Sequence, residues 1–468
     1  AVLTARHPER VASAMLIAPS VPFGPLANIR MLEQFVAPEC GDQGWARFNR
    51  DYWRRDLEGF AQFFFEQCFV EPHSTKQIED CVGWAMETSA DTLIDTMLAR
   101  GLLGDEDERL YRTIRRPVIV LQGDQDRIVA PSQGRMVADT IGAPLVTLEG
   151  SGHVPVARDP VLINRLIRDF VDRTTGTGAP VRTIRHGMRR PRRALYLSSP
   201  IGLGHARRDL AIARALRTLR PDLAIDWLTQ HPVTPLLEKA GERVHDASRL
   251  LVNESAHIEH ESGEHDLHVF EALRRMDEIM VANFMVFQDV VDDGTYDLVI
   301  ADEAWDVDHY WHEHPELKRG ALAWFTDFVG YAPMPEGGDR EAFLTADYNA
   351  EMLEHVERHP RVRDRSIFVG NAADIVPGTF GRNLPGIRDW TARHFAFSGY
   401  ITGRAAPDRD DRAARRREFG FADGETVCIA TVGGSAVGAH LLRRIIAAAP
   451  AIRRRVPGMR MIVVAGPR

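Results

Sequence analysis

The stretch LYLSSPIGLGHARRDLAIARAL, residues 195–216, decides how the second half of the chain folds. Its apolar start, bounded by two serines and a proline, predicts a buried strand. Gly202 and Gly204 then predict a tight turn in which the backbone comes close to a ligand or another segment. After His205, apolar residues recur at helical spacing, at Leu210, Ala213 and Leu216. The unit is a strand, a glycine turn and a helix, with the histidine at the carboxyl end of the strand, where open α/β sheets bind ligands.

This turn resembles the first βα turn of GT-B glycosyltransferases. That group includes the plant-type UDP-glycosyltransferases and the bacterial enzyme that adds N-acetylglucosamine to the lipid-linked peptidoglycan precursor. In the former, a histidine directly after such a glycine deprotonates the acceptor hydroxyl, and the resemblance implies this role for His205. It also implies contacts with the nucleotide sugar for Gly202 and Gly204. Rossmann dehydrogenases have glycine-rich turns too, but Arg207 stands where their G-x-G-x-x-G motif requires its third glycine. The alternative is a helix-capping turn with a solvent-facing histidine.

Length and composition limit the classes to consider. A chain of 468 residues predicts about three domains. Its net charge of −8 argues against a nucleic-acid-binding protein. The four cysteines have no C-x-x-C spacing, which is typical of free thiols in a reducing compartment. No apolar run approaches the ~20 residues of a membrane span, and no signal peptide is recognisable. We therefore expect a cytoplasmic protein without a transmembrane segment, for which peripheral membrane contact stays open.

Both ends of the chain suggest that it is a piece of a longer protein. Residue 1 is Ala1 rather than Met and already lies in a predicted helix. At the other end, a predicted strand over 461–466 stops just after its glycine. We expect a fragment.

Residues 1–173 have the order of an α/β domain. A strand near 15–17 is followed, over about 21–113, by a helical and aromatic region without period-2 alternation, which predicts a lid over the site. The apolar strand 116–121 and the strand 145–148 then alternate with helices, as in a parallel sheet. The pair Asp159-Pro160 predicts the start of the last helix.

Asp126 and His153 follow these two successive strands, 27 positions apart (153 − 126). An acid–histidine pair needs this placement, because the carboxylate orients the imidazole that takes a proton from a nucleophile. The region resembles the C-terminal two-thirds of the α/β-hydrolase fold, in which a G-x-x-D run supplies the acid and a G-H-x-P run supplies the histidine. No G-x-S-x-G is present, so we expect the nucleophilic serine upstream of Ala1 and little or no hydrolysis by the fragment. The alternative is that both residues make structural hydrogen bonds.

Residues 174–192 are rich in glycine, threonine and arginine and predict a linker between domains. Their arginines fit a solvated linker better than an anion-binding patch. The acceptor-type GT-B domain is expected over 193–400. In it, 253–268 is polar and predicts a loop, and a long amphipathic helix is expected near 269–291. Four histidines in the polar segment leave zinc binding open as an alternative, namely His257, His260, His265 and His268.

Asp302 ends the predicted strand 297–302 and lies 97 positions after His205 (302 − 205). A parallel sheet brings these strand ends together, where the carboxylate would raise the basicity of the imidazole. In the UDP-glycosyltransferases an aspartate about this far along pairs with the base, and Asp302 matches it. Glu303 and Asp306 compete for the role. Asp327 is a weaker acceptor-site candidate, and three aromatic residues could either stack on a sugar or pack in the core, namely Trp305, Tyr310 and Trp311.

Residues 401–468 begin a donor-type domain. A strand over 427–432 ends in Gly433, Gly434 and Ser435, and a helix follows. This unit is similar to the G-G-S loop that meets the donor diphosphate in the peptidoglycan-type transferases, with one extra residue before Gly438. Backbone N–H groups at a helix start suit a phosphate. The alternative is a plain βα turn.

Together these patterns predict an α/β chain: a partial α/β-hydrolase parallel sheet with a helical lid, followed by two Rossmann-like GT-B domains, the second truncated. The resemblances imply a fusion of a serine-type α/β-hydrolase with an inverting glycosyltransferase. Such a protein would use a nucleotide sugar, expected to be UDP-linked, and a small-molecule or lipid-linked hydroxyl acceptor, with no other cofactor and no metal. Two alternatives stay open: a transferase with a non-catalytic hydrolase-like module, and a nucleotide-sugar epimerase of GT-B fold.

Overall fold

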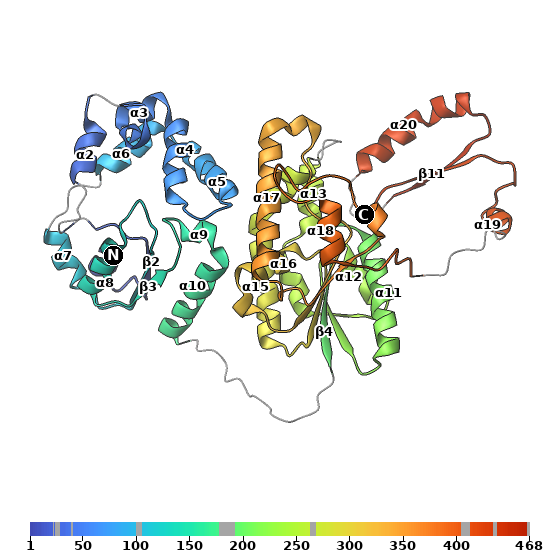
Figure 1. Ribbon diagram of the computed structural model, residues 1–468, viewed down its shortest axis with the longest axis horizontal. Helices are drawn as coiled ribbons and strands as arrows, with labels where there is room; N and C mark the ends of the chain where they lie inside the picture. Colours follow the sequence, from blue (N-terminus) through green and yellow to red (C-terminus); the bar gives the residue numbers. More distant parts are fainter. Residues whose placement is uncertain are drawn as a thin grey trace. The chain divides into compact units, whose positions relative to one another are not determined.

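The computed structural model describes residues 1–21, 23, 29–38, 41–99, 105–176, 192–262, 268–403, 412–433 and 438–465. The chain divides into two compact units, Ala1–Arg185 and His186–Arg468 (Figure 1). The linker was predicted to start at residue 174, but helix α10 (Pro160–Thr175) includes Thr174 and Thr175. Residues 177–191 lie outside the described part. Of the four cysteines, three are described, and all three are free thiols.

The first unit contains a three-stranded parallel sheet in the order β1-β2-β3. The strands are β1 (Ala14–Ile17), β2 (Val118–Gly123) and β3 (Leu145–Leu148). Every residue of β2 is buried, because helices cover both of its faces. Val120 packs with Val137 of α8 (Pro131–Ile141) on one face, and Leu121 packs with Ile163 of α10 on the other. This two-faced burial explains why the strand reads as a continuous apolar run.

The chain between β1 and β2 is helical in its described residues, as the sequence predicts. Its helices are α2 (Ile29–Val36), α3 (Arg50–Arg55), α4 (Leu57–Cys68), α5 (Thr75–Met86), α6 (Ala90–Ala99) and α7 (Asp105–Tyr111), with the short turn η1 (Gly44–Arg47). Aromatic residues of this helical insert form a core of their own, with Phe35, Phe48, Trp53 and Phe60 in mutual ring contact. Two short helices complete the unit, α1 (Val2–Arg6) and α9 (Pro155–Arg158).

The second unit is built on a seven-stranded, wholly parallel sheet in the order β10-β9-β8-β7-β4-β5-β6. Its strands are β4 (Arg193–Ser198), β5 (Ala224–Leu228), β6 (Arg243–Val244), β7 (Leu298–Asp302), β8 (Ala321–Thr326), β9 (Arg365–Phe368) and β10 (Ala396–Phe397). β7 is the central strand of the sheet, and β4 lies beside it, between β7 and β5. The predicted α/β class with parallel sheets is therefore confirmed.

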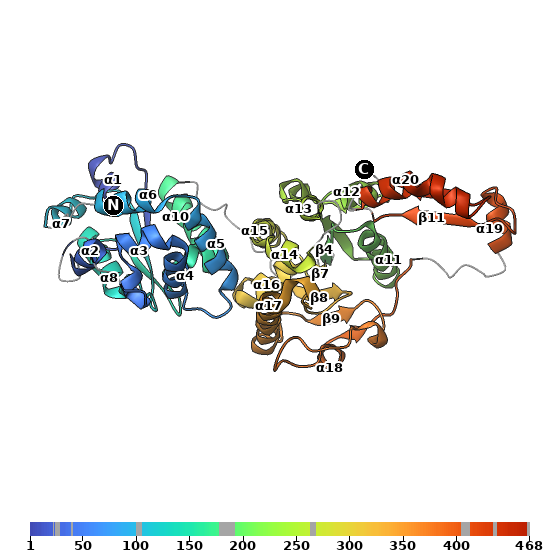
Figure 2. The ribbon, with the colours of Figure 1, turned by 90° about the horizontal axis from the view of Figure 1, so that it is seen from above.

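Helices cover both faces of this sheet (Figure 2). On one face, α11 (Leu203–Leu219) and α12 (Val233–Lys239) pack on the ring stack of Tyr196 and Trp227, whose centroids lie 4.3 Å apart. On the other face lie α15 (Asp277–Asp293) and α16 (Trp305–Glu313), and α17 (Gly338–Arg358) packs on α16. Shorter elements fill the connections: η2 (Asp246–Leu250), η3 (Pro315–Leu317), η4 (Pro335–Gly337), η5 (Ala372–Asp374) and α18 (Ile387–His394).

Two predicted elements of this unit are wrong. Residues expected to form a polar loop include a helix, α13 (Glu254–Glu261), because the side chain of Asn253 caps it by accepting a hydrogen bond from the backbone N–H of Ala256 at 2.8 Å. The long helix expected near 269–291 is two helices, α14 (Val269–Arg274) and α15, separated by Arg275 and Met276. Polar composition was therefore a poor indicator of a loop here.

The last described segment contains a two-stranded parallel pair, β11 (Val427–Thr431) and β12 (Arg460–Val464), connected through α20 (Ala439–Arg455). Helix α19 (Arg412–Glu418) precedes it. Gly433 follows β11, as predicted, whereas Gly434 and Ser435 lie outside the described residues. Across the described parts of both units, we find no helix with the length and apolar character needed to cross a membrane.

Candidate functional site

The register of two central strands assembles the site of the second unit. Ser198, the last residue of β4, pairs with Asp302, the last residue of β7. Because neighbouring parallel strands end at the same edge of the sheet, Asp302 lies beside the loop that leads from β4 into α11. Helix α11 begins at Leu203, so His205 is its third residue and stands at this edge. Positions 97 residues apart (302 − 205) therefore become neighbours.

The glycine turn itself is shorter than the sequence predicts. Gly204 and His205 lie within the first turn of α11, and Gly202 is its N-cap residue with an extended backbone, φ −157°. Neither glycine has a positive φ, and open space surrounds the position of a Cβ at Gly204. Because neither glycine has a side chain, no side chain at these two positions covers the start of the helix. A role of the two glycines in nucleotide-sugar binding stays a prediction.

His205 is paired with Asp302. The imidazole Nδ1 lies 3.1 Å from Oδ2 of Asp302, whose side chain is fully buried. Burial favours the neutral carboxyl, but the hydrogen bonds from His205 and Arg208 outweigh it and hold the pKa of Asp302 below its usual value. Burial likewise lowers the pKa of His205, and the two neighbouring carboxylates more than compensate, so that the pKa of the imidazole is raised. An ionised Asp302 favours the tautomer with the proton on Nδ1, which leaves the Nε2 lone pair free to accept a proton.

Arg208, one helical turn after His205, binds the same carboxylate. Its guanidinium donates hydrogen bonds to both oxygens of Asp302, and its third nitrogen donates to Asp327 Oδ2 at 2.9 Å. Arg208 also lies 2.9 Å from His205 Nδ1. Because arginine only donates, this contact is not a hydrogen bond in the tautomer with the proton on Nδ1, which donates to Asp302 instead. Arg208 thus holds Asp302 in place, and its positive charge opposes the rise in the pKa of His205.

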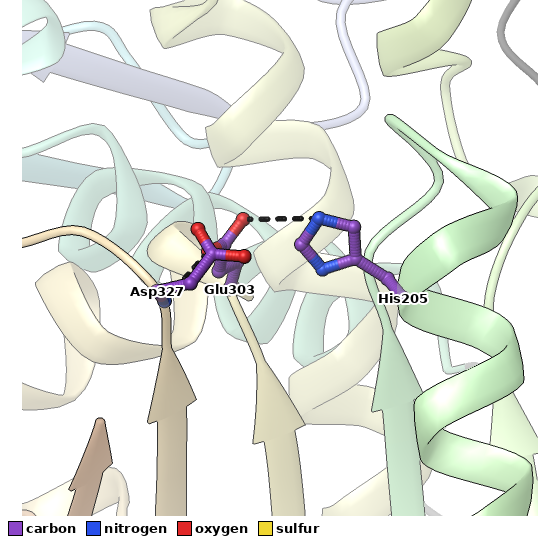
Figure 3. A group of neighbouring side chains, drawn as sticks. All are labelled: His205, Glu303 and Asp327. Atoms are coloured by element: carbon purple, nitrogen blue, oxygen red, sulfur yellow. Dashed lines mark hydrogen bonds and ion pairs between the residues drawn. The ribbon is translucent and has the colours of Figure 1, made fainter. Parts of the chain in front are cut away.

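Glu303 faces the opposite side of the imidazole ring. Its Oε2 lies 3.7 Å from His205 Nε2 (Figure 3). Burial raises the pKa of Glu303 to about 8. The sequence left Asp302, Glu303 and Asp306 as rival partners of the histidine. In the structure Asp302 lies at Nδ1 and Glu303 near Nε2, while Asp306 lies in the first turn of α16.

Other predicted residues occupy different places. Trp311 is fully buried in the core and Tyr310 nearly so, which confirms the core alternative for both. Trp305 packs against Trp324 and Phe328, and its side chain is half-buried. Of the four histidines at 257, 260, 265 and 268, His257 donates a hydrogen bond from Nε2 to the backbone oxygen of Ala272, 2.9 Å away, and His265 lies outside the described residues.

Sequence reasoning missed Arg208 and Asp209. Asp209 is fully buried and accepts hydrogen bonds from Tyr196 Oη at 2.9 Å and from Ser198 Oγ. Burial and the charge of Asp302 raise its pKa well above the usual value. The signal was present: Arg208 stands at i+3 from His205, so both face the same side of the predicted helix.

The described residues include two groups close enough to hold a metal ion. They are His205 with Glu303 and Asp327, and His309 with Glu313 and Glu351, with the ligand atoms of each group within 4.8 Å of one another. In the first group, Arg208 already pairs with Asp327.

The first unit brings its two predicted residues together in the same way. His153 Nδ1 lies 2.9 Å from Asp126 Oδ2, and the other oxygen of Asp126 accepts hydrogen bonds from the backbone N–H groups of Ile128 and Val129, both at 2.8 Å. Burial opposes ionisation, yet the hydrogen bonds from His153 and the backbone lower the pKa of Asp126. Gln122 donates a further hydrogen bond to Oδ2 at 2.9 Å. A fixed, ionised carboxylate at Nδ1 is what a histidine base requires.

The helical insert holds the loop of this histidine. The backbone N–H of Gly152 donates to Glu71 Oε1 at 2.8 Å, and that of His153 donates to the carbonyl oxygen of Cys68 at 2.8 Å. A Cβ at Gly152 would lie 2.4 Å from the same carbonyl oxygen. At Gly123 a Cβ would lie 2.3 Å from the carbonyl oxygen of Ser151. Both glycines of the predicted motifs are therefore required by close backbone approach.

Comparison with known proteins assigns a family to the first unit. Residues 1–166 match the model of the alpha/beta hydrolase family. None of the curated proteins compared with the chain matches it significantly.

Solved structures similar to the chain fall into two kinds. The glycotransferase of kitacinnamycin shares 14% identity over 60% of this chain and 67% of its own, with a TM-score of 0.35. The glycosyltransferase SnogD from Streptomyces nogalater shares 16% over 59% and 67%, with a TM-score of 0.29. The esterase RhEst1 from Rhodococcus sp. ECU1013 shares 19% over 36% and 59%, with a TM-score of 0.28. The chain spans less than two thirds of the length of that esterase, and likenesses at these TM-scores carry no functional conclusion. The family match identifies residues 1–166 as an alpha/beta hydrolase domain by fold family.

Proposed function

We propose that the second unit transfers a sugar from a nucleotide-sugar donor to a hydroxyl acceptor, with His205 as the general base. The observation that carries the proposal is the pairing of His205 Nδ1 with the buried Asp302 at 3.1 Å, at the edge of a parallel sheet where ligands bind. Asp302 acts as a positioning residue, and Arg208 holds its carboxylate. UDP is the expected nucleotide.

The reaction follows from this arrangement. Nε2 of His205 accepts the proton of the acceptor hydroxyl while the oxygen forms a bond to the anomeric carbon. The bond from that carbon to the diphosphate breaks, and the nucleotide diphosphate leaves with the electron pair. A single displacement of this kind inverts the configuration at the anomeric carbon. General base catalysis of this type contributes roughly 10²- to 10⁴-fold.

The test measures nucleotide release by the intact protein with a panel of nucleotide sugars and acceptor alcohols. We expect release only when an acceptor is present and a loss of about a hundredfold or more in His205→Ala. His231→Ala is the matched control, because His231 lies in the same unit outside the His205 cluster. Release without an acceptor would favour the epimerase alternative, and unchanged release in His205→Ala would refute the base.

We further propose that the first unit belongs to an ester hydrolase, in which Asp126 orients His153. The family match over residues 1–166 and the 2.9 Å contact between these two side chains support this activity. The test is p-nitrophenyl ester hydrolysis by the intact protein. We expect His153→Ala to abolish it while sugar transfer continues. An intact protein that hydrolyses no ester would favour a non-catalytic module.

A further inference from the structure

Glu303 is held at the site by a strained backbone. It directly follows β7 and has a φ of 53°, a left-handed conformation that few residues other than glycine adopt. Such a conformation costs about 1–3 kcal/mol and persists where the surrounding structure enforces it, often at functional sites. Its side chain is only 5% exposed. The protein therefore maintains a buried carboxyl beside its proposed base.

The two oxygens of Glu303 have different surroundings. Oε1 lies within hydrogen-bond distance of the backbone N–H of Asp327, at 3.2 Å, and of Thr326 Oγ1, at 3.4 Å. Oε2 faces His205 Nε2 across 3.7 Å, which is too long for a hydrogen bond (Figure 3). Two polar atoms that can both accept a hydrogen therefore face one another, at the position where the acceptor must bind.

The charges around Glu303 are unbalanced. Asp302 and Asp327 both pair with the guanidinium of Arg208, whereas Glu303 faces the imidazole of His205, which is uncharged when it acts as the base. The titratable groups that influence Glu303 are His205 from α11, Asp302 from β7 and Asp327 after β8, and Glu303 in turn raises the pKa of Tyr331. Burial and the two aspartates raise the pKa of Glu303 to about 8, and a cation close to Oε2 would favour its ionised form.

We propose that Glu303 selects acceptors in which a protonated amine stands next to the reacting hydroxyl. The hydroxyl donates to His205 Nε2 while the ammonium donates to Glu303 Oε2. Two heteroatoms on neighbouring carbons lie close enough together for each to donate a hydrogen bond to one of two acceptors that are 3.7 Å apart. The proposal rests on the proposed function of the second unit. The amine stays protonated throughout, and the carboxyl of Glu303 releases one proton to solvent as the cation binds.

The kinetic test uses two acceptors that differ in one group, trans-2-aminocyclohexanol and trans-cyclohexane-1,2-diol. We expect kcat/KM for nucleotide release to favour the amino alcohol by about tenfold or more, because a charge-assisted hydrogen bond is roughly twice as strong as a neutral one. Glu303→Gln should remove this preference, so that the ratio of the kcat/KM values for the two acceptors falls to about one. Glu336→Gln, at an exposed carboxylate of the same unit, should keep it. An equal preference in wild type, or a preference that survives in Glu303→Gln, overturns the proposal.

A binding measurement separates this proposal from the proposed function. Calorimetry of trans-2-aminocyclohexanol at pH 7, in two buffers of different ionisation enthalpy, should show the release of about one proton in wild type and none in Glu303→Gln. Glu303-dependent binding without any acceptor-dependent nucleotide release would refute the transferase and leave the amine site standing. Absence of amine binding, or Glu303-dependent uptake of Zn²⁺ by chelator-treated protein in its place, overturns the amine site.

Discussion

Replacing Asp302 by asparagine removes one charge at the proposed base and nearly conserves the shape of the side chain. At 3.1 Å from Nδ1, a carboxylate stabilises an imidazolium by about 5 kcal/mol at an effective dielectric constant of about 20. Arg208, which donates to the same carboxylate, offsets part of this interaction. We therefore expect the activation free energy for sugar transfer to rise by about 3–5 kcal/mol. This rise lowers kcat/KM roughly a hundred- to several-thousandfold.

The assay is acceptor-dependent nucleotide release as a function of pH. Asp302→Asn should also move the acidic limb of kcat/KM to lower pH, because Asp302 raises the pKa of His205. Since a positioning residue acts only through the base, the double variant His205→Ala/Asp302→Asn should be hardly slower than His205→Ala alone. Thermal unfolding of each variant serves as the folding control.

Two results would refute this reasoning. A change in kcat/KM of less than threefold in a folded Asp302→Asn protein would mean that the contact is structural. Fully additive losses in the double variant would mean that Asp302 acts independently of the histidine.

The remaining predictions concern the base and the two cores. In wild type, kcat/KM should rise with pH through a midpoint above 6.5, because the base works unprotonated and the pKa of His205 is raised from that value; a midpoint below 6.5 would contradict the site. Gly152→Ala should destabilise the first unit by about 1–3 kcal/mol in urea unfolding, since its Cβ would lie 2.4 Å from a carbonyl oxygen. The control Gly83→Ala should not destabilise it, because open space surrounds that position in helix α5. Arg363→Met should cost about 3–5 kcal/mol because it leaves the buried carboxylate of Asp308 without its cation, and adding Asp308→Leu should recover most of that loss; an equally unstable double variant would contradict the reasoning.

The sequence predicted most of the sheet because parallel strands leave a strong local signal. The strands containing Val120, Leu195 and Val299 are continuous apolar runs, as burial on both faces requires. Helix boundaries were less predictable, because they depend on single capping hydrogen bonds such as that of Asn253. Most polar residues of α13 are buried or half-buried, and polar composition alone does not distinguish such a helix from a loop.

The sequence predicted which residues form the candidate sites, but it predicted their relative positions only in part. Strand-end positions pointed to Asp126, His153, His205 and Asp302, and the structure places them as two pairs. The sequence could not rank Asp302 above Glu303, because the assignment depends on the left-handed backbone at Glu303, which turns its side chain to the other ring nitrogen. Whether these groups perform chemistry stays a prediction.

The contact between the helical insert and the histidine loop of the first unit couples two movements. The loop of His153 is hydrogen-bonded to the carbonyl oxygen of Cys68 and to Glu71, so a displacement of this part of the insert breaks bonds that position the imidazole. By linkage the effect is reciprocal: whatever fixes the imidazole also stabilises this position of the insert, by the same free energy. A ligand that immobilised His153 would thereby make this part of the insert harder to displace.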